Sequence, residues 1–136
     1  MKDYEEQYVT FETAKLLDKA GFNYKCRQFY LHDGGRWPYT HQTVLPQNEP
    51  ACHAPTQAQA MRWLRSFGKV IEIKVVHHPE LNASITFEYR YFVYDHFGKH
   101  TPKPLLYFEQ YEECVEEAIK YAISLLEGRN DYEKKI

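Results

Sequence analysis

The stretch Pro55-Thr56-Gln57-Ala58-Gln59-Ala60-Met61-Arg62-Trp63-Leu64-Arg65-Ser66-Phe67-Gly68 decides the fold, because it contains the start, the apolar face and the end of one helix. Thr56 and Gln59 have the spacing of a capping box, in which each side chain bonds to the backbone N–H of the other residue. Gly68 is the usual type of residue just past a helix end. The alternating run Val70–Val76 follows at once and predicts a strand with one solvated face.

A second alternating run, Ile85–Tyr94, follows a turn-forming segment at 77–83, and we expect it to pair antiparallel with Val70–Val76. The better core face of this second run consists of Ile85, Phe87, Tyr89, Tyr91 and Val93. The opposite face consists of Thr86, Glu88, Arg90, Phe92 and Tyr94. If helices cover one face of the sheet, the aromatic side chains of the opposite face remain exposed.

Two further helices are expected, one before and one after the helix and the two strands described above. Thr10 is the expected cap of a helix over Phe11–Ala20, which Gly21 ends. The last helix has an apolar stripe at three- and four-residue steps, which consists of Tyr111, Cys114, Val115, Ala118, Ile119, Ala122, Leu125 and Leu126. Gly128 is its expected end, before a polar tail at 129–136. Glutamates fill its first turns and are expected to be solvated, namely Glu109, Glu112, Glu113, Glu116 and Glu117.

We therefore predict a single α+β domain over residues 1–136, with three helices packed on one face of a mostly antiparallel sheet of three or four strands. Tyr24–Leu31 is a further expected strand, and Leu105–Phe108 is a short edge strand. The connection from Arg36 to Ala54 lacks periodicity and is unusually long. It either contains a short strand at Thr43–Leu45 or is a functional loop.

The net charge and the number of cysteines indicate which partners and which cellular compartment to expect. The net charge is −2, with 17 basic and 19 acidic residues, which argues against a general binder of nucleic acid or of anionic membranes. Three cysteines are too few for a disulfide framework, and no secretory signal is expected before Asp3. We expect a reduced, cytoplasmic protein with no membrane partner.

Several features together carry a resemblance: Ala20-Gly21-Phe22 at a helix end, an aromatic strand led by Cys26, the opening Ala54-Pro55-Thr56-Gln57 and the closing helix from Tyr111 to Leu126. In these the chain resembles small uncharacterised proteins of gut anaerobic bacteria and their phages or mobile elements. That set has no assigned activity, so the resemblance implies an accessory role in a phage or mobile element and transfers no functional residue.

The residues give little support to site chemistry. Histidines occur as His77-His78, as His96 and His100, and beside Cys52 as His53, but none has the spacing of a zinc site on one rigid element, so we predict no metal. Cys52 paired with His53 or His41 is the one candidate nucleophile, and no third orienting group can be named for it. We predict no catalytic residue and no cofactor.

The sequence therefore favours a non-catalytic interaction or accessory protein that works through a protein partner or as a homo-oligomer. The alternative is single-stranded nucleic-acid binding through Tyr89–Tyr94, where a cation alternates with aromatic rings as in stacking platforms. The residues that would carry this contact, or a contact with a protein partner, are Arg90, Phe92, Tyr94, Arg62 and Arg65. A third hypothesis is a Cys/His enzyme that uses the 36–54 loop.

Overall fold

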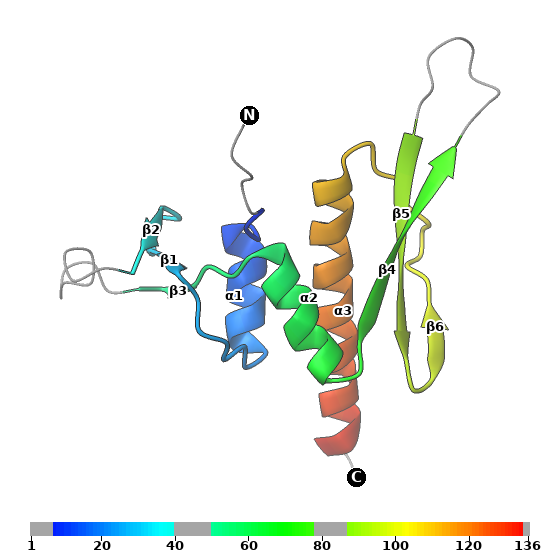
Figure 1. Cartoon of the computed structure of the whole chain (residues 1–136). Coiled ribbons are helices and arrows are strands. Elements are labelled where there is room, and N and C mark those ends of the chain that lie inside the picture. The colour runs from blue at the N-terminus through cyan, green and yellow to red at the C-terminus, as the bar shows by residue number, and fades with distance from the viewer. Residues whose placement is uncertain (1–6, 40–49, 78–86, 135–136) are drawn as a thin grey trace. The chain divides into compact units, whose positions relative to one another are not determined.

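The computed structural model describes residues 7–39, 50–77 and 87–134, and the chain divides into two compact units, residues 1–63 and 64–136. The α+β class and the three helices are confirmed (Figure 1). The strands form two antiparallel three-stranded sheets, of order β2-β1-β3 and β4-β5-β6, where the sequence predicted one sheet. Each sheet lies within one of the two units.

In the first unit, α1 (Phe11–Lys19) begins as predicted and ends one residue early, with Ala20 as its C-cap. Thr10 Oγ1 accepts a hydrogen bond from the Thr13 N–H at 3.3 Å, and Gly21 takes a positive φ of 99°, which an L side chain rarely adopts. The central strand β1 (Gln28–Tyr30) is much shorter than the predicted Tyr24–Leu31.

The long connection after β1 supplies both neighbours of that strand. β2 (Arg36–Pro38) and β3 (Cys52–His53) flank β1, each antiparallel to it. The connection therefore contributes strands at its two ends. The predicted strand Thr43–Leu45 lies outside the described residues.

The helix α2 (Gln57–Ser66) forms where its sequence signals place it. The capping box is confirmed, because Thr56 N–H donates to Gln59 Oε1 at 2.9 Å and Gln59 N–H donates to Thr56 Oγ1 at 3.1 Å. Gly68 follows with a positive φ of 78°. These local bonds satisfy the first backbone donors of the helix, which explains why the start was readable from sequence alone.

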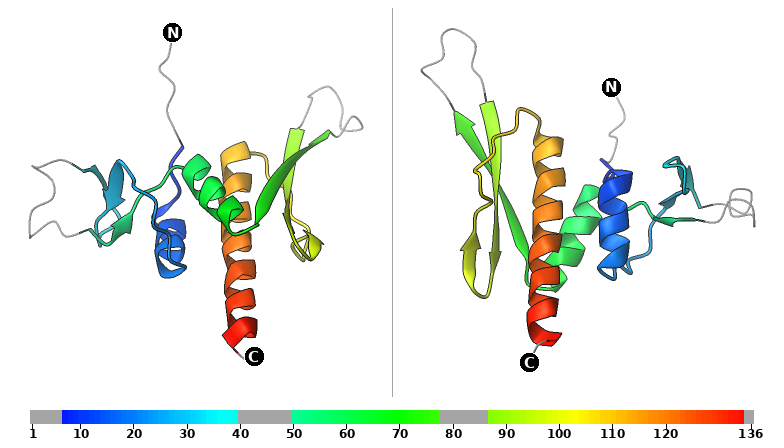
Figure 2. Two further views of the ribbon diagram at one scale, coloured as in Figure 1. Left: turned by 60° about the horizontal axis from the view of Figure 1, so that its bottom comes forward. Right: turned by 180° about the vertical axis from the view of Figure 1, so that it is seen from behind.

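In the second unit, β4 (Val70–His77) and β5 (Phe87–Asp95) pair antiparallel as predicted. Their register places Val70 opposite Tyr94 and Ile73 opposite Tyr91. A short third strand, β6 (Gly98–His100), folds back on β5 and was not foreseen from the sequence. The helix α3 (Tyr111–Lys134) lies beside this hairpin, which Figure 2 shows from two further sides.

Tyr89 and Tyr91 of the predicted core face pack against α3, whereas Ile85 lies outside the described residues. Tyr91 forms a buried cluster with Cys114 and Ala118 of the helix, and Ile71 and Ile73 of β4 pack against it. Phe87 departs from the prediction, since it is 50% exposed. Tyr89, two residues further along the same face, already lies against Tyr111, the first residue of α3, with ring centroids 5.6 Å apart. Phe87 is therefore beyond the start of the covering helix.

Three smaller predictions for the second unit were wrong in detail. The helix α3 continues past Gly128 to Lys134, because one glycine in a helix costs only about 1 kcal/mol and no proline follows. Glu116 is buried rather than solvated. The segment 105–108 contributes only an isolated bridge, in which Phe108 and Tyr89 exchange two backbone hydrogen bonds of 2.8 and 2.7 Å.

A buried ion pair lies at the start of β4. Lys69 Nζ is 2.7 Å from Asp95 Oδ2, and both side chains are almost completely buried. His100 Nε2 lies 2.8 Å from Asp95 Oδ1, and the Phe97 N–H donates to the same oxygen at 2.8 Å. Burial alone would raise the pKa of Asp95, but the hydrogen bonds from Lys69, His100 and Phe97 outweigh it and hold this pKa well below its usual range.

The Asp95→Asn substitution should destabilise the second unit by about 3–5 kcal/mol at neutral pH, because it leaves the Lys69 ammonium buried without an opposite charge. Since the folded-state pKa of Asp95 is lowered, its carboxylate stabilises the fold above the unfolded value of about 3.9. This stabilisation is lost as the pH falls through the folded-state pKa. Urea unfolding should therefore show the gap between wild type and variant narrowing in acid.

The matched control is Asp18→Asn, which changes an exposed carboxylate of α1 and should alter the unfolding free energy little. An Asp95→Asn protein as stable as wild type, or a gap that stays constant from neutral to strongly acid pH, would contradict the role given to the ion pair.

Candidate functional site

The candidate nucleophile Cys52 is not set up for chemistry. Its side chain is buried in β3, and this burial, together with the negative charge of Asp18, raises its pKa to about 11. The neighbouring His53 is engaged by another group, since its Nδ1 lies 2.9 Å from the Tyr39 hydroxyl. The other proposed partner, His41, lies outside the described residues. The structure thus gives Cys52 no base that would activate it within the described part of the chain.

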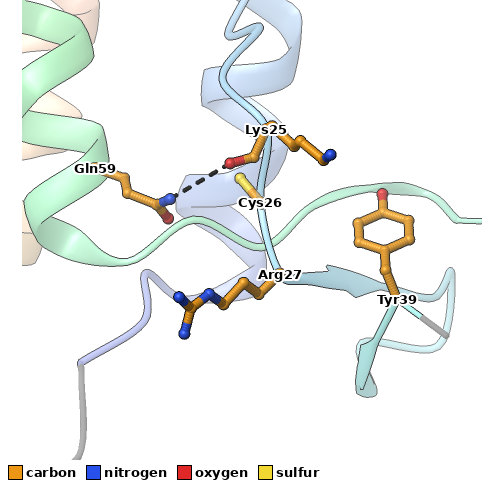
Figure 3. A pocket seen from close by; sticks show the side chains of 5 residues that line it. All are labelled: Lys25, Cys26, Arg27, Tyr39 and Gln59. Atoms are coloured by element: carbon orange, nitrogen blue, oxygen red, sulfur yellow. Dashed lines mark hydrogen bonds between the residues drawn. The ribbon is translucent and has the colours of Figure 1, made fainter.

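One pocket of about 430 Å³ lies in the first unit and was not foreseen from the sequence (Figure 3). Its lining residues are Lys25, Cys26, Arg27, Tyr39 and Gln59. Gln59 Nε2 donates to the Lys25 carbonyl oxygen at 3.5 Å, which ties α2 to the segment before β1. The pocket depends on residues that are distant in the sequence, so no local pattern indicated it. Pairing of β1 with β2 brings Tyr39 beside Arg27, whose carbonyl oxygen accepts a hydrogen bond from the Tyr39 N–H at 3.0 Å.

The pocket residues do not form a reactive or anion-binding constellation. Figure 3 shows the Lys25 ammonium and the Arg27 guanidinium extending away from each other, so the two charges do not converge. Burial raises the pKa of the Cys26 thiol to about 11, which disfavours the thiolate. The five lining residues therefore offer neither an activated nucleophile nor a paired cation.

Two of the histidines that suggested a metal site, His53 and His100, have other neighbours, whereas His78 lies outside the described residues. His100 is bound to Asp95, whose two carboxylate oxygens are both occupied by groups of the second unit. Among residues 7–39, 50–77 and 87–134, no group of three or more His, Cys, Asp or Glu side chains is arranged to hold a metal ion.

We call the face of the β4–β5–β6 sheet turned away from the α3 cluster the outer face. By strand alternation and register it contains Glu72, Lys74, Arg90, Phe92, Tyr94 and Lys99. Phe92 was expected to be exposed there, yet it is only 3% exposed. Two cations cover its ring, with Lys99 Nζ 3.9 Å and Arg90 Cζ 4.9 Å from the centroid. Phe92 consequently presents no open stacking surface.

The other predicted contact residues are spread along the chain. Tyr94 lies on the outer face, and its hydroxyl donates to Glu72 Oε1 at 3.4 Å. Arg62 and Arg65 are exposed on α2, but Arg62 belongs to the first unit whereas Arg90 belongs to the second. Arg90, Phe92 and Tyr94 therefore share one surface, and the described geometry does not join Arg62 to it.

The feature best suited to binding is the edge formed by β4. Among the described strands β4 pairs with β5 alone, so its other side presents backbone donors and acceptors for a further strand. Five of its eight residues are β-branched, and it contains neither proline nor glycine. Val70 is 44% exposed and Val75 is 55% exposed. Sequence alternation assigned these residues to faces but could not show that the strand ends its sheet.

Apolar side chains continue from this edge past the start of α3. Val75 lies opposite Tyr89 in the strand register, and Tyr89 contacts Tyr111. Tyr111 and Phe87 are both about half exposed. We call Val75, Phe87 and Tyr111 the apolar margin of the second unit. Exposed apolar groups that lie together are typical of surfaces that bind another protein.

Comparisons of this chain with protein-family models, with curated proteins and with solved structures gave no match. In the described residues no helix combines the length and apolar character needed to cross a membrane. The function must therefore be argued from the chain's own surfaces, of which the β4 edge is the most distinctive.

All three thiols should react slowly in the folded protein. Burial raises the pKa of Cys26 and Cys52 to about 11 and that of Cys114 to about 12, so very little thiolate is present near neutral pH. Labelling with an aromatic disulfide reagent at neutral pH should be far slower for native than for denatured protein. A single cysteine that reacts faster in the native than in the denatured protein would indicate an activated thiol and revive the enzyme hypothesis.

Proposed function

We propose that this protein is a non-catalytic interaction module that acts by self-association through its second unit. The observation that carries the proposal is the eight-residue β4, which ends its sheet with exposed apolar side chains. Natural proteins usually blunt such an edge with a proline, a bulge, a very short strand or charged side chains, above all lysine. β4 has neither proline nor short length, and its two charged residues, Glu72 and Lys74, have opposite signs, so that a partner strand can pair them.

The apolar margin supports the same function. Val75 and Phe87 lie on the sheet at the start of α3, and Tyr111 is the first residue of that helix. Burying each large apolar side chain stabilises an interface by about 1.5–3 kcal/mol at most. The described candidates for a catalytic nucleophile do not support an enzyme, since Cys52 and Cys26 are buried thiols with raised pKa values. The resemblance to proteins of phages and mobile elements adds the expectation of an accessory role, which examination of the neighbouring genes would test.

Light scattering over a range of protein concentrations should show a dimer that dissociates on dilution. Val75→Lys should weaken this dimer, because it replaces an exposed apolar side chain with a charge that would have to be buried in the contact without a partner. Phe97→Ser is the matched control, since Phe97 is even more exposed but lies in the turn between β5 and β6. A wild-type protein that stays monomeric at every concentration would refute self-association.

The second candidate is binding of single-stranded nucleic acid by the outer face. The observation that favours it is the presence of Lys74, Arg90 and Lys99 on one surface beside Tyr94. The burial of Phe92 under two of these cations argues against it.

Fluorescence anisotropy with labelled single-stranded DNA and RNA separates the two functions. Under the proposed function we expect no binding at low salt, where phosphate contacts are strongest. Binding that weakens steeply with salt and that Arg90→Ala reduces by about tenfold or more would instead establish the nucleic-acid function.

A further inference from the structure

We propose that two copies of this chain join through their β4 strands, antiparallel and with a two-fold axis at Ile73, into one sheet of order β6-β5-β4-β4-β5-β6. This inference rests on the proposed self-association and specifies its contact. An antiparallel pair of identical edge strands is related by an axis normal to the sheet, so residues that face each other lie on the same face. The α3 helices of the two copies then cover the same side of the joined sheet.

The side chains of β4 are self-complementary about Ile73. On the outer face, Glu72 of each copy comes opposite Lys74 of the other, which gives two symmetric ion pairs. On the α3 face, Ile71 comes opposite Val75, and the two Ile73 side chains meet at the axis. On the outer face, Val70 of each copy also comes opposite Val76 of the other. The partly exposed Val70 and Val75 thus both gain an apolar neighbour.

Charge excludes the neighbouring registers. Placing the axis at residue 72 would set Glu72 opposite its own copy, and placing it at residue 74 would do the same to Lys74. Like charges directly opposite each other are destabilising in a sheet. An axis between two residues is impossible, because facing residues must share a face. The register centred on Ile73 is therefore the one that satisfies both charged residues.

The environment of Lys74 within one chain points to the same partner. Lys74 lies opposite Arg90 in the β4–β5 register, on the outer face, which is an unfavourable pair of like charges. A carboxylate arriving on the free side of β4 offsets this repulsion. Glu72 of the second copy arrives at that position. Glu72 itself lies opposite Phe92, and its one hydrogen bond to a described residue is a long one of 3.4 Å from Tyr94, so its charge is left available.

The covering helix lies mainly against the strand next to β4. α3 packs more extensively on β5 than on the edge strand β4. Both Glu72 and Lys74 are exposed on the opposite face.

The test is a charge-reversal experiment that uses two single variants and their mixture. Glu72→Lys alone and Lys74→Glu alone each convert both ion pairs of the homodimer into like-charge pairs. Each should raise the dimer dissociation constant by about tenfold or more at low salt. An equimolar mixture of the two variants sets every positive residue opposite a negative one. It should therefore restore a dimer, which is a heterodimer of one copy of each variant.

The double variant Glu72→Lys/Lys74→Glu is the matched control, because it keeps both pairs with their signs exchanged and should dimerise like wild type. Sedimentation velocity reports the species, and circular dichroism confirms that each variant is folded. The differences should shrink in high salt, where exposed charges are screened.

The outcomes separate the two proposals. Single variants that dimerise as tightly as wild type, or a mixture of folded variants that stays monomeric, would overturn the register while leaving self-association intact. A monomeric wild-type protein would overturn both. Recovery of the dimer in the mixture supports the register, because a variant damaged in its fold could not regain affinity from a second damaged variant.

Discussion

The buried contact between Lys69 and Asp95 is the constraint on which the second unit depends. The two side chains meet at 2.7 Å where water is almost absent, and a buried charge that loses its partner is strongly destabilising. Lys69 immediately precedes β4 and Asp95 ends β5, so this contact lies next to the first strand pair, Val70 with Tyr94. An alignment slipped from this register would separate Lys69 from Asp95, and a charge that stays buried would then lose its partner.

The alignment held by that ion pair assigns every residue of β4 to a face. A slip of one residue would move the whole set of side chains to the opposite side. With the observed register, Ile71 and Ile73 face the α3 cluster, whereas Glu72 and Lys74 face outward. The first residue of α3, Tyr111, then determines how much of the sheet the helix covers. Val75 and Phe87, which lie near this end of the helix, remain exposed. The proposed contact surface thus follows from the same alignment that stabilises the unit.

Features that depend on neighbours in sequence could be predicted, and features that depend on distant neighbours could not. The capping box of Thr56 and Gln59 and the α1 cap at Thr10 are bonds over three residues, so the sequence displays both partners together. The division of the strands into two sheets depends instead on which distant segments meet. The burial of Phe92 has the same origin, because Lys99 reaches its ring through the pairing of β6 with β5.

In the candidate site, too, the local features could be predicted and the long-range features could not. The alternation in Val70–Val76 revealed a strand with one charged face, but an edge strand and a central strand can share such a pattern. Its position at the edge became visible only with the sheet order β4-β5-β6. The pocket beside Cys26 gave no signal, because its lining comes from three separate segments of the chain.

An exposed edge strand normally risks open-ended aggregation, and the arrangement proposed for β4 avoids this. Because the contact is two-fold, each copy uses its β4 edge once, and the joined sheet ends on β6 at both sides. β6 has three residues, which is too short to recruit another strand effectively. The charges of Glu72 and Lys74 permit one register and oppose its neighbours, so they add specificity to an otherwise adhesive apolar strand. A strand with these properties is better suited to a closed dimer than to a fibre or to an indiscriminate apolar surface.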